Sequence, residues 1–100
     1  MNGKKHTELH KWRERATQED LPCRKCGRVG LMTLDHIVPI SFIQQLGLRE
    51  EAYDDDWNFQ YLCRACNLLK GSQLDYNNPK TIENIRRYVD LAEQTYCNPI

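Results

Sequence analysis

The sequence lacks long apolar runs, and it has no excess of charge of either sign. None of its hydrophobic stretches approaches the roughly 18 residues that span a bilayer. The opening residues also lack the continuous apolar segment of a secretory signal. Lys and Arg number 14, as do Asp and Glu, so the formal net charge is zero. We therefore expect a soluble, cytoplasmic protein without a membrane partner.

Repeats and low-complexity tracts are absent as well, and glycine and proline are few, at five and four. The chain has 100 residues, of which 40% are hydrophobic, and this fits one small globular domain spanning residues 1–100. A chain of this length buries only about 60 to 65% of its unfolded surface, so its apolar core alone leaves it marginally stable. We expect an additional stabilising element.

Neutral net charge conceals segregation along the chain. Residues 1–28 hold eight basic and four acidic side chains, for a net charge of +4, whereas residues 47–57 hold one basic and five acidic side chains, for −4. A basic end is compatible with docking on nucleic-acid phosphates. Solvated surface charge is the simpler alternative, and the pattern alone does not decide between the two.

Four of the five cysteines form two Cys-x-x-Cys pairs. Cys23 and Cys26 precede a stretch of 36 residues, and Cys63 and Cys66 follow it. Two such pairs are typical of a four-thiolate zinc site, in which each pair supplies one edge of a tetrahedron. A structural zinc ion contributes on the order of 10 kcal/mol of folding free energy, which is what a small core lacks.

Two other interpretations of the cysteines stay open at this point. Disulfides are disfavoured by a reducing cytosol. A rubredoxin-like iron site is weakened because Asn67 stands where a second glycine after the cysteine pair is expected. Cys97 is most simply a spare thiol.

The remaining pattern predicts helices and strands in a mixed order. We expect a basic helix at about 7–20, a strand at 31–38, a short helix or apolar turn at 40–46 and an acidic, solvated loop at 48–56. A second strand at 57–62 should pair with the first. A helix should run from about 64 to 73, and another from about 79 to 95, with Asn78 as its cap and a packing face formed by Ile82, Ile85, Val89 and Ala92.

Three motifs lie in order on this framework: Asp35-His36-Ile37-Val38-Pro39, Trp57-Asn58-Phe59-Gln60 and Cys63-Arg64-Ala65-Cys66-Asn67. Together with the first cysteine pair they resemble the HNH endonucleases, the ββα-metal nuclease superfamily, in a zinc-stapled four-cysteine form. The resemblance covers residues 23–71. It implies an α+β fold: a small zinc-stapled ββα-metal domain with flanking N- and C-terminal helices.

The resemblance also implies roles for four residues. His36 is the general base that deprotonates the attacking water, and a histidine suits this because its ordinary pKa of about 6.5 leaves much of it neutral at pH 7. Asp35 and Asn67 are the protein ligands of a catalytic divalent cation. Asn67 stands where the family's final histidine is usual, so the chain is an HNN variant, and these oxygen ligands favour Mg²⁺ or Mn²⁺. Asn58 supports the backbone that presents His36.

The implied activity is hydrolysis of DNA phosphodiesters, leaving 5′-phosphate and 3′-hydroxyl ends on duplex or branched DNA. Candidate phosphate contacts are the basic residues near these motifs and in the first helix: Lys70, Arg64, Lys11, Arg13, Arg15, Arg24 and Lys25. A homodimer, or a protein partner from phage or restriction machinery, is compatible with such a domain. The rival interpretation is a zinc-knuckle DNA-binding module without catalysis.

Overall fold

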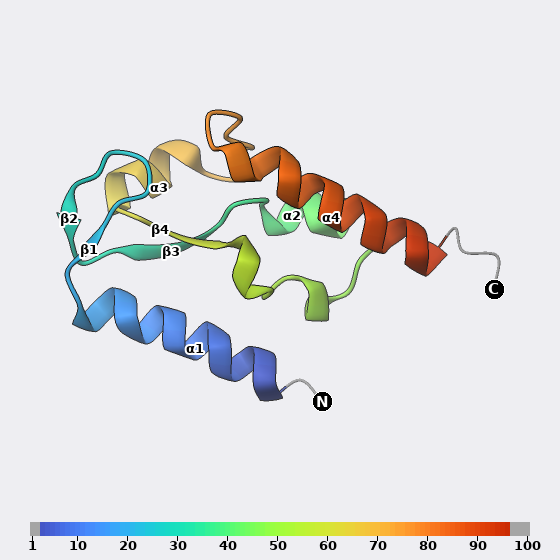
Figure 1. Ribbon diagram of the computed structural model, residues 1–100, viewed down its shortest axis with the longest axis horizontal. Helices are drawn as coiled ribbons and strands as arrows, with labels where there is room; N and C mark the ends of the chain where they lie inside the picture. The colour runs from blue at the N-terminus through green and yellow to red at the C-terminus, as the bar shows by residue number, and fades with distance from the viewer. Residues whose placement is uncertain (1–2, 97–100) are drawn as a thin grey trace.

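The computed structural model describes residues 3–96 and has the expected α+β architecture (Figure 1). Four helices are α1 (Gly3–Gln18), α2 (Ile40–Gln45), α3 (Arg64–Lys70) and α4 (Pro79–Tyr96). Four short strands are β1 (Leu21–Pro22), β2 (Val29–Gly30), β3 (Thr33–His36) and β4 (Phe59–Leu62), with 3-10 turns η1 (Glu50–Ala52) and η2 (Asp56–Asn58) before β4. The flanking helices are therefore confirmed, whereas the prediction for Cys97 lies outside the described residues.

The strands form two antiparallel pairs. Strands β1 and β2 pair on either side of the first cysteine pair, and β3 pairs with β4 so that Asp35 lies opposite Gln60. The predicted pairing is thus confirmed, but both strands are shorter than expected. Strand β4 begins only at Phe59, because residues 56–58 curl into η2, where the Asn58 amide bonds to the Asp55 carbonyl at 2.9 Å. Strand β3 ends at His36, three residues before Pro39, which has no N–H to donate.

Helix boundaries follow local backbone chemistry. Helix α3 ends at Lys70 rather than near residue 73, because Gly71 adopts a positive φ of 55° that breaks the helix. Helix α4 begins at Pro79, as predicted, and the Lys80 amide donates to Asn78 Oδ1 at 2.9 Å. Helix α1 starts earlier than expected, at Gly3, and runs along one side of the β3–β4 pair while α4 runs along the other (Figure 1).

Two small apolar clusters lie at opposite ends of the β3–β4 pair. One surrounds the cysteines and includes Met32 and Leu62, and the other joins α2 to α4 and includes Val38 and Tyr88. A set of buried polar residues separates them: Asp35, Asn58, Gln60, Lys70, Asn78, Thr81 and Asn84. Among the residues that the structure describes, no buried side-chain nitrogen or oxygen lacks a hydrogen-bond partner. The polar set is therefore a layer between the two cores, in which one bonded group surrounds Asp35 and another joins Asn58 to Asn84.

The buried face of α4 matches the predicted one in part. Ile85 and Ala92 pack against the cluster of Val38 and Tyr88, as predicted, but Ile82 is 51% exposed, and Thr81, Asn84 and Tyr88 are buried. The helix is rotated because it faces the polar layer: Thr81 Oγ1 donates to the Asp75 carbonyl and Asn84 Nδ2 to the Trp57 carbonyl. Across residues 3–96 none of the helices has the length and apolar content to cross a membrane.

Candidate active site and metal centre

The four cysteines of the two pairs converge at one end of the molecule. The sulfur atoms of Cys23, Cys26, Cys63 and Cys66 all lie within 4.8 Å of one another, and those of Cys26 and Cys63 are 3.8 Å apart. Zinc bound tetrahedrally at about 2.3 Å from each thiolate requires sulfur atoms roughly 3.8 Å apart. The cysteines are therefore arranged to bind a metal ion, and this donor set suits zinc.

Each pair has the same local geometry. The Cys26 amide faces Cys23 Sγ at 3.5 Å, and the Cys66 amide faces Cys63 Sγ at 3.4 Å. Burial raises the pKa of Cys23, but backbone N–H groups, led by that of Cys26, outweigh burial and lower it to about 6. The Cys66 pKa is raised to about 12, first by its hydrogen bond with Cys63, then by burial and the other sulfur atoms. Four crowded thiols resist joint ionisation unless a cation offsets the charge.

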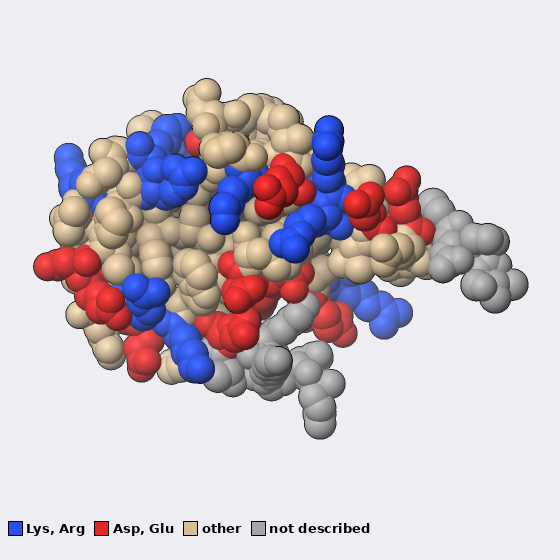
Figure 2. Space-filling view, viewed as in Figure 1, with Lys and Arg blue, Asp and Glu red and all other residues tan. Residues whose placement is uncertain are grey.

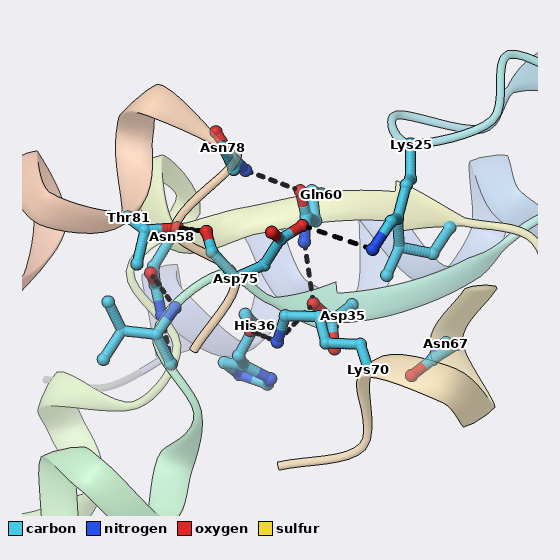
Figure 3. Close-up of polar contacts among 12 residues, drawn as sticks. Lys25, Asp35, His36, Asn58, Gln60, Asn67, Lys70, Asp75, Asn78 and Thr81 are labelled. Carbon is cyan, nitrogen blue, oxygen red and sulfur yellow. Dashed lines mark hydrogen bonds and ion pairs between the residues drawn. The ribbon is translucent and has the colours of Figure 1, made fainter. Parts of the chain in front are cut away.

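Asp35 lies in the middle of the buried polar layer (Figure 3). Its Oδ2 accepts a hydrogen bond from Gln60 Nε2 at 2.8 Å, and Lys70 Nζ lies 3.1 Å from the same oxygen. Lys70 also donates to the His36 carbonyl at 3.0 Å. Both charged side chains are almost completely buried, with 3% exposure for Lys70 and 9% for Asp35. The site thus contains a buried carboxylate whose Oδ2 has two donors.

Lys70, predicted as a phosphate contact, lies largely inside the site. Helix α3 directs this side chain inward, onto Asp35. The reason is electrostatic, because a buried carboxylate requires a nearby cation or several donors. Lys70 is therefore part of the interior of the site in this structure rather than of its outer surface.

His36 ends β3 and is partly buried. Its ring packs edge-on against Phe59, with centroids 5.4 Å apart, and its Nε2 lies 3.4 Å from Asp54 Oδ1. The sequence placed Asp54 in a solvated loop, but only 24% of its side chain is exposed. Turns η1 and η2 fold the acidic segment back onto β3, and this long-range contact left no local signal in the sequence.

Asn58 anchors the segment that follows His36. Its Oδ1 accepts from the Val38 amide and its Nδ2 donates to the Val38 carbonyl, each at 2.9 Å. Asn84 of α4 donates to the same Oδ1 at 3.1 Å. With no exposed surface, Asn58 joins η2 to the segment after β3 and to α4.

Asn67 lies on α3, three residues before Lys70. Its Nδ2 donates to Thr33 Oγ1 at 2.7 Å, and Thr33 Oγ1 in turn donates to the Leu62 carbonyl at 2.7 Å. Because its amide nitrogen is bonded to β3, Oδ1 is the atom of the Asn67 side chain that is suited to hold a cation. Figure 3 shows Asn67 and Asp35 on facing elements, α3 and β3.

Two shallow clefts open beside the Asp35–Lys70 pair. One, of about 240 Å³, is lined by residues around His36: Leu34, Asp35, His36, Pro39, Ile40, Ser41, Lys70, Gly71 and Ser72. The other, of about 230 Å³, lies by the first cysteine pair: Arg24, Lys25, Gln60, Leu62, Lys70, Asp75, Asn77 and Asn78. Asp35 and His36 therefore border open space that a ligand can enter.

The other predicted phosphate contacts are all exposed, but they lie in different places. Arg24 and Lys25 line the second cleft. Arg64 begins α3, and Figure 2 shows basic side chains over this end of the molecule. Lys11, Arg13 and Arg15 belong to α1, across the β3–β4 pair, and Arg15 is paired with Glu19 at 3.3 Å. The predicted DNA contacts on α1 therefore do not share one surface with those at the second cleft and at the start of α3.

The fold and site define a small α+β domain with a four-cysteine metal centre and an Asp-His pair beside a cleft. The sequence model of one family, the HNH endonucleases, matches residues 23–73, half of the chain. The chain belongs to the HNH endonuclease family. No match was found among the curated proteins or among the solved structures. The matched segment includes both cysteine pairs and the Asp35-His36 motif but excludes α1 and α4.

Proposed function

We propose that this protein is a metal-dependent endonuclease that hydrolyses DNA phosphodiester bonds. The observation that carries the proposal is the placement of Asp35 and His36 at the end of β3, facing α3 with Asn67 and bordering an open cleft, within the family match. A four-cysteine domain that only bound DNA would have no need of this constellation.

The chemistry assigned to His36 is removal of a proton from the attacking water. A neutral imidazole ring has one nitrogen that donates and one that accepts. Asp54 beside Nε2 favours the tautomer with hydrogen on Nε2, which makes Nδ1 the proton acceptor. Asn58 limits movement of the following backbone and so helps to hold the ring in place.

Asp35 and Asn67 fit a hard divalent cation, Mg²⁺ or Mn²⁺, because they offer one carboxylate and one amide oxygen. The Lys70 ammonium beside Asp35 shows that this position accommodates positive charge. A bound cation would neutralise charge on the phosphate and on the departing 3′ oxygen. With His36 as base, one such cation suffices, and the products carry 5′-phosphate and 3′-hydroxyl ends.

Duplex or branched DNA is the proposed partner. Arg24 and Lys25 line the second cleft together with Gln60 and Lys70, the two residues that contact Asp35, and are proposed to hold a phosphate next to the one that is cleaved. Arg64 extends this basic surface along α3. These contacts are made to the DNA backbone, so they position the substrate without reading its sequence.

The test is cleavage of supercoiled plasmid by zinc-loaded protein with Mg²⁺ or Mn²⁺. We expect nicked or linear product that is lost in His36→Ala and in EDTA. His10→Ala, at an exposed histidine of α1, is the matched control and should cut like the wild type.

The rival function, a DNA-binding module without catalysis, is favoured by the Asp35–Lys70 ion pair, which satisfies the carboxylate internally. Plasmid that is retarded but uncut by every variant would establish this rival.

A further inference from the structure

The proposed metal site is supported by Asn78, the residue immediately before α4, which lies outside the matched segment. We propose that Asn78 is a positioning residue for Asp35 and acts through Gln60. The inference rests on the proposed function, in which Asp35 holds a divalent cation. It assigns a role in the site to a residue whose position in the sequence predicted helix capping alone.

The three side chains form a directed chain of hydrogen bonds (Figure 3). Asn78 Nδ2 donates to Gln60 Oε1 at 3.1 Å, and Gln60 Nε2 donates to Asp35 Oδ2 at 2.8 Å. All three residues are buried, at 7% exposure for Asn78 and 8% for the other two. Each link is therefore shielded from competition with bulk water.

The direction of this chain is determined at both ends. At one end the Lys80 backbone amide, which can only donate, bonds to Asn78 Oδ1 at 2.9 Å. Arg24 Nη2 approaches the same oxygen at 3.4 Å. Asn78 must then present its NH₂ group to Gln60. At the other end an ionised Asp35 can only accept, which matches the NH₂ group that Gln60 presents to it.

Gln60 alone does not have this directionality. The two ends of a glutamine amide have nearly the same shape, so partners determine which end faces where. With Asn78 in place, Gln60 donates to Asp35, and Lys70 approaches the same Oδ2 at 3.1 Å. Both contacts hold Oδ2, so Oδ1 is the carboxylate oxygen left to face a cation. Asn78 thus sets the orientation of Asp35 through one intervening residue, Gln60.

Asn78→Asp separates this role from helix capping. Aspartate caps helices as well as asparagine does, so the Lys80 contact survives. In this variant, however, residue 78 presents to Gln60 a carboxylate oxygen, which only accepts. Whichever way the Gln60 amide is turned, its oxygen then faces a carboxylate oxygen, either that of residue 78 or that of Asp35. Asn78→Ser is the comparison variant, because serine keeps the cap but is too short to contact Gln60 and adds no charge.

The experiment measures Mn²⁺ affinity of zinc-loaded protein by electron paramagnetic resonance, together with thermal stability. We expect Asn78→Asp to bind Mn²⁺ about tenfold more weakly than the wild type and, because of the facing acceptors, to melt at a lower temperature. Asn78→Ser should have an intermediate affinity and should melt within a few degrees of the wild type. The added negative charge alone would tighten Mn²⁺ binding, so simple attraction predicts the opposite sign.

Asp35→Asn serves as the site control and should abolish the Mn²⁺ signal. Wild-type affinity in both Asn78 variants would overturn the positioning role while leaving the metal site intact. Should Mn²⁺ binding in the wild type be absent, or unchanged in Asp35→Asn, the proposed function itself is overturned, and with it the role of Asn78. If Asn78→Asp does not fold, Asn78→Ser decides: a loss of Mn²⁺ affinity without a loss of melting temperature supports the proposal.

Discussion

Lys70 Nζ lies 3.1 Å from Asp35 Oδ2 and 3.0 Å from the His36 carbonyl, so one ammonium group contacts both residues of the Asp-His pair. Lys70 at Oδ2 and the proposed cation at Oδ1 would both offset the charge of this one carboxylate. Lys70 therefore stabilises the carboxylate without a cation, and it would lower the net attraction of the proposed site for one.

Replacing Lys70 with methionine should expose this dual role. The variant leaves a buried carboxylate without its ion pair, and breaking such a pair costs about 3 to 5 kcal/mol. We expect this variant to have a lower melting temperature than the wild type in EDTA. Adding Mn²⁺ should raise its melting temperature by more than that of the wild type, because the cation then supplies the missing charge. Thermal melts with and without Mn²⁺ measure both effects.

Arg64→Met is the matched control, since it removes an exposed charge from the same helix. It should change neither the melting temperature nor the response to Mn²⁺ by a comparable amount. Equal increases on adding Mn²⁺ in Lys70→Met and the wild type would show that Lys70 and the cation do not share Asp35.

Loss of one cysteine of the metal centre should unfold the domain. Cys63 is a proposed ligand, and its sulfur also accepts the Cys66 amide at the start of α3. A serine hydroxyl can still accept this amide, so Cys63→Ser removes the metal ligand while it keeps the helix cap. A zinc site worth on the order of 10 kcal/mol is comparable with the whole stability of a small domain. We expect one zinc per chain in the wild type and none in Cys63→Ser, by atomic absorption, with loss of helical circular dichroism.

Cys97→Ser provides the control for this experiment. It changes the thiol count by one but leaves both Cys-x-x-Cys pairs intact. The variant should retain one zinc and its helical spectrum. Zinc retained by Cys63→Ser, or lost from Cys97→Ser, would contradict the assignment of the four ligands.

The two clefts and α1 suggest different paths for DNA, and salt dependence distinguishes them. Lys25 lines the cleft beside Asp35, whereas Lys11 lies on α1, across the β3–β4 pair. Each phosphate contact contributes about 0.9 to the slope of log affinity against log salt concentration. We expect Lys25→Ala to lower this slope by about that amount, in fluorescence anisotropy with duplex DNA, and Lys11→Ala to leave it unchanged. The reverse result would place the DNA along α1.

The parts of the site that could be predicted are those encoded by local spacing. Two Cys-x-x-Cys pairs predict a metal centre because each pair needs only one turn of backbone to align its sulfur atoms. The alternating aromatic and polar residues of 57–62 predicted a strand paired with the first one, and this pairing is confirmed, whereas the register that places Asp35 opposite Gln60 comes from the structure. Asn78 was predicted as a helix cap from its position before Pro79, and the structure confirms this.

Contacts that depend on how elements are packed could not be predicted in this way. Helical spacing places Lys70 near Asn67, but its burial against Asp35 depends on how α3 packs on β3, which the spacing does not show. Asp54 meets His36 only because two 3-10 turns reverse an acidic loop. The second role of Asn78 required the position of α4 relative to β4, for which no pattern in the chain supplies a signal.

Tyr88, which has no exposed surface, should make stability fall at alkaline pH. Its hydroxyl donates to the Ala52 carbonyl at 3.0 Å, and burial, followed by the charges of Asp55 and Asp54, raises its pKa. In the unfolded chain a tyrosine ionises near pH 10, whereas the folded chain keeps its proton, so the stabilising contribution is complete below pH 10 and declines above it.

Tyr88→Phe should cost about 1 kcal/mol at pH 7 through the lost hydrogen bond and should lose less stability than the wild type between pH 9 and 10.5. Guanidinium unfolding at these pH values measures the difference, with Tyr76→Phe, at an exposed tyrosine, expected to follow the wild type. Parallel curves for Tyr88→Phe and the wild type would show that Tyr88 does not account for the alkaline loss.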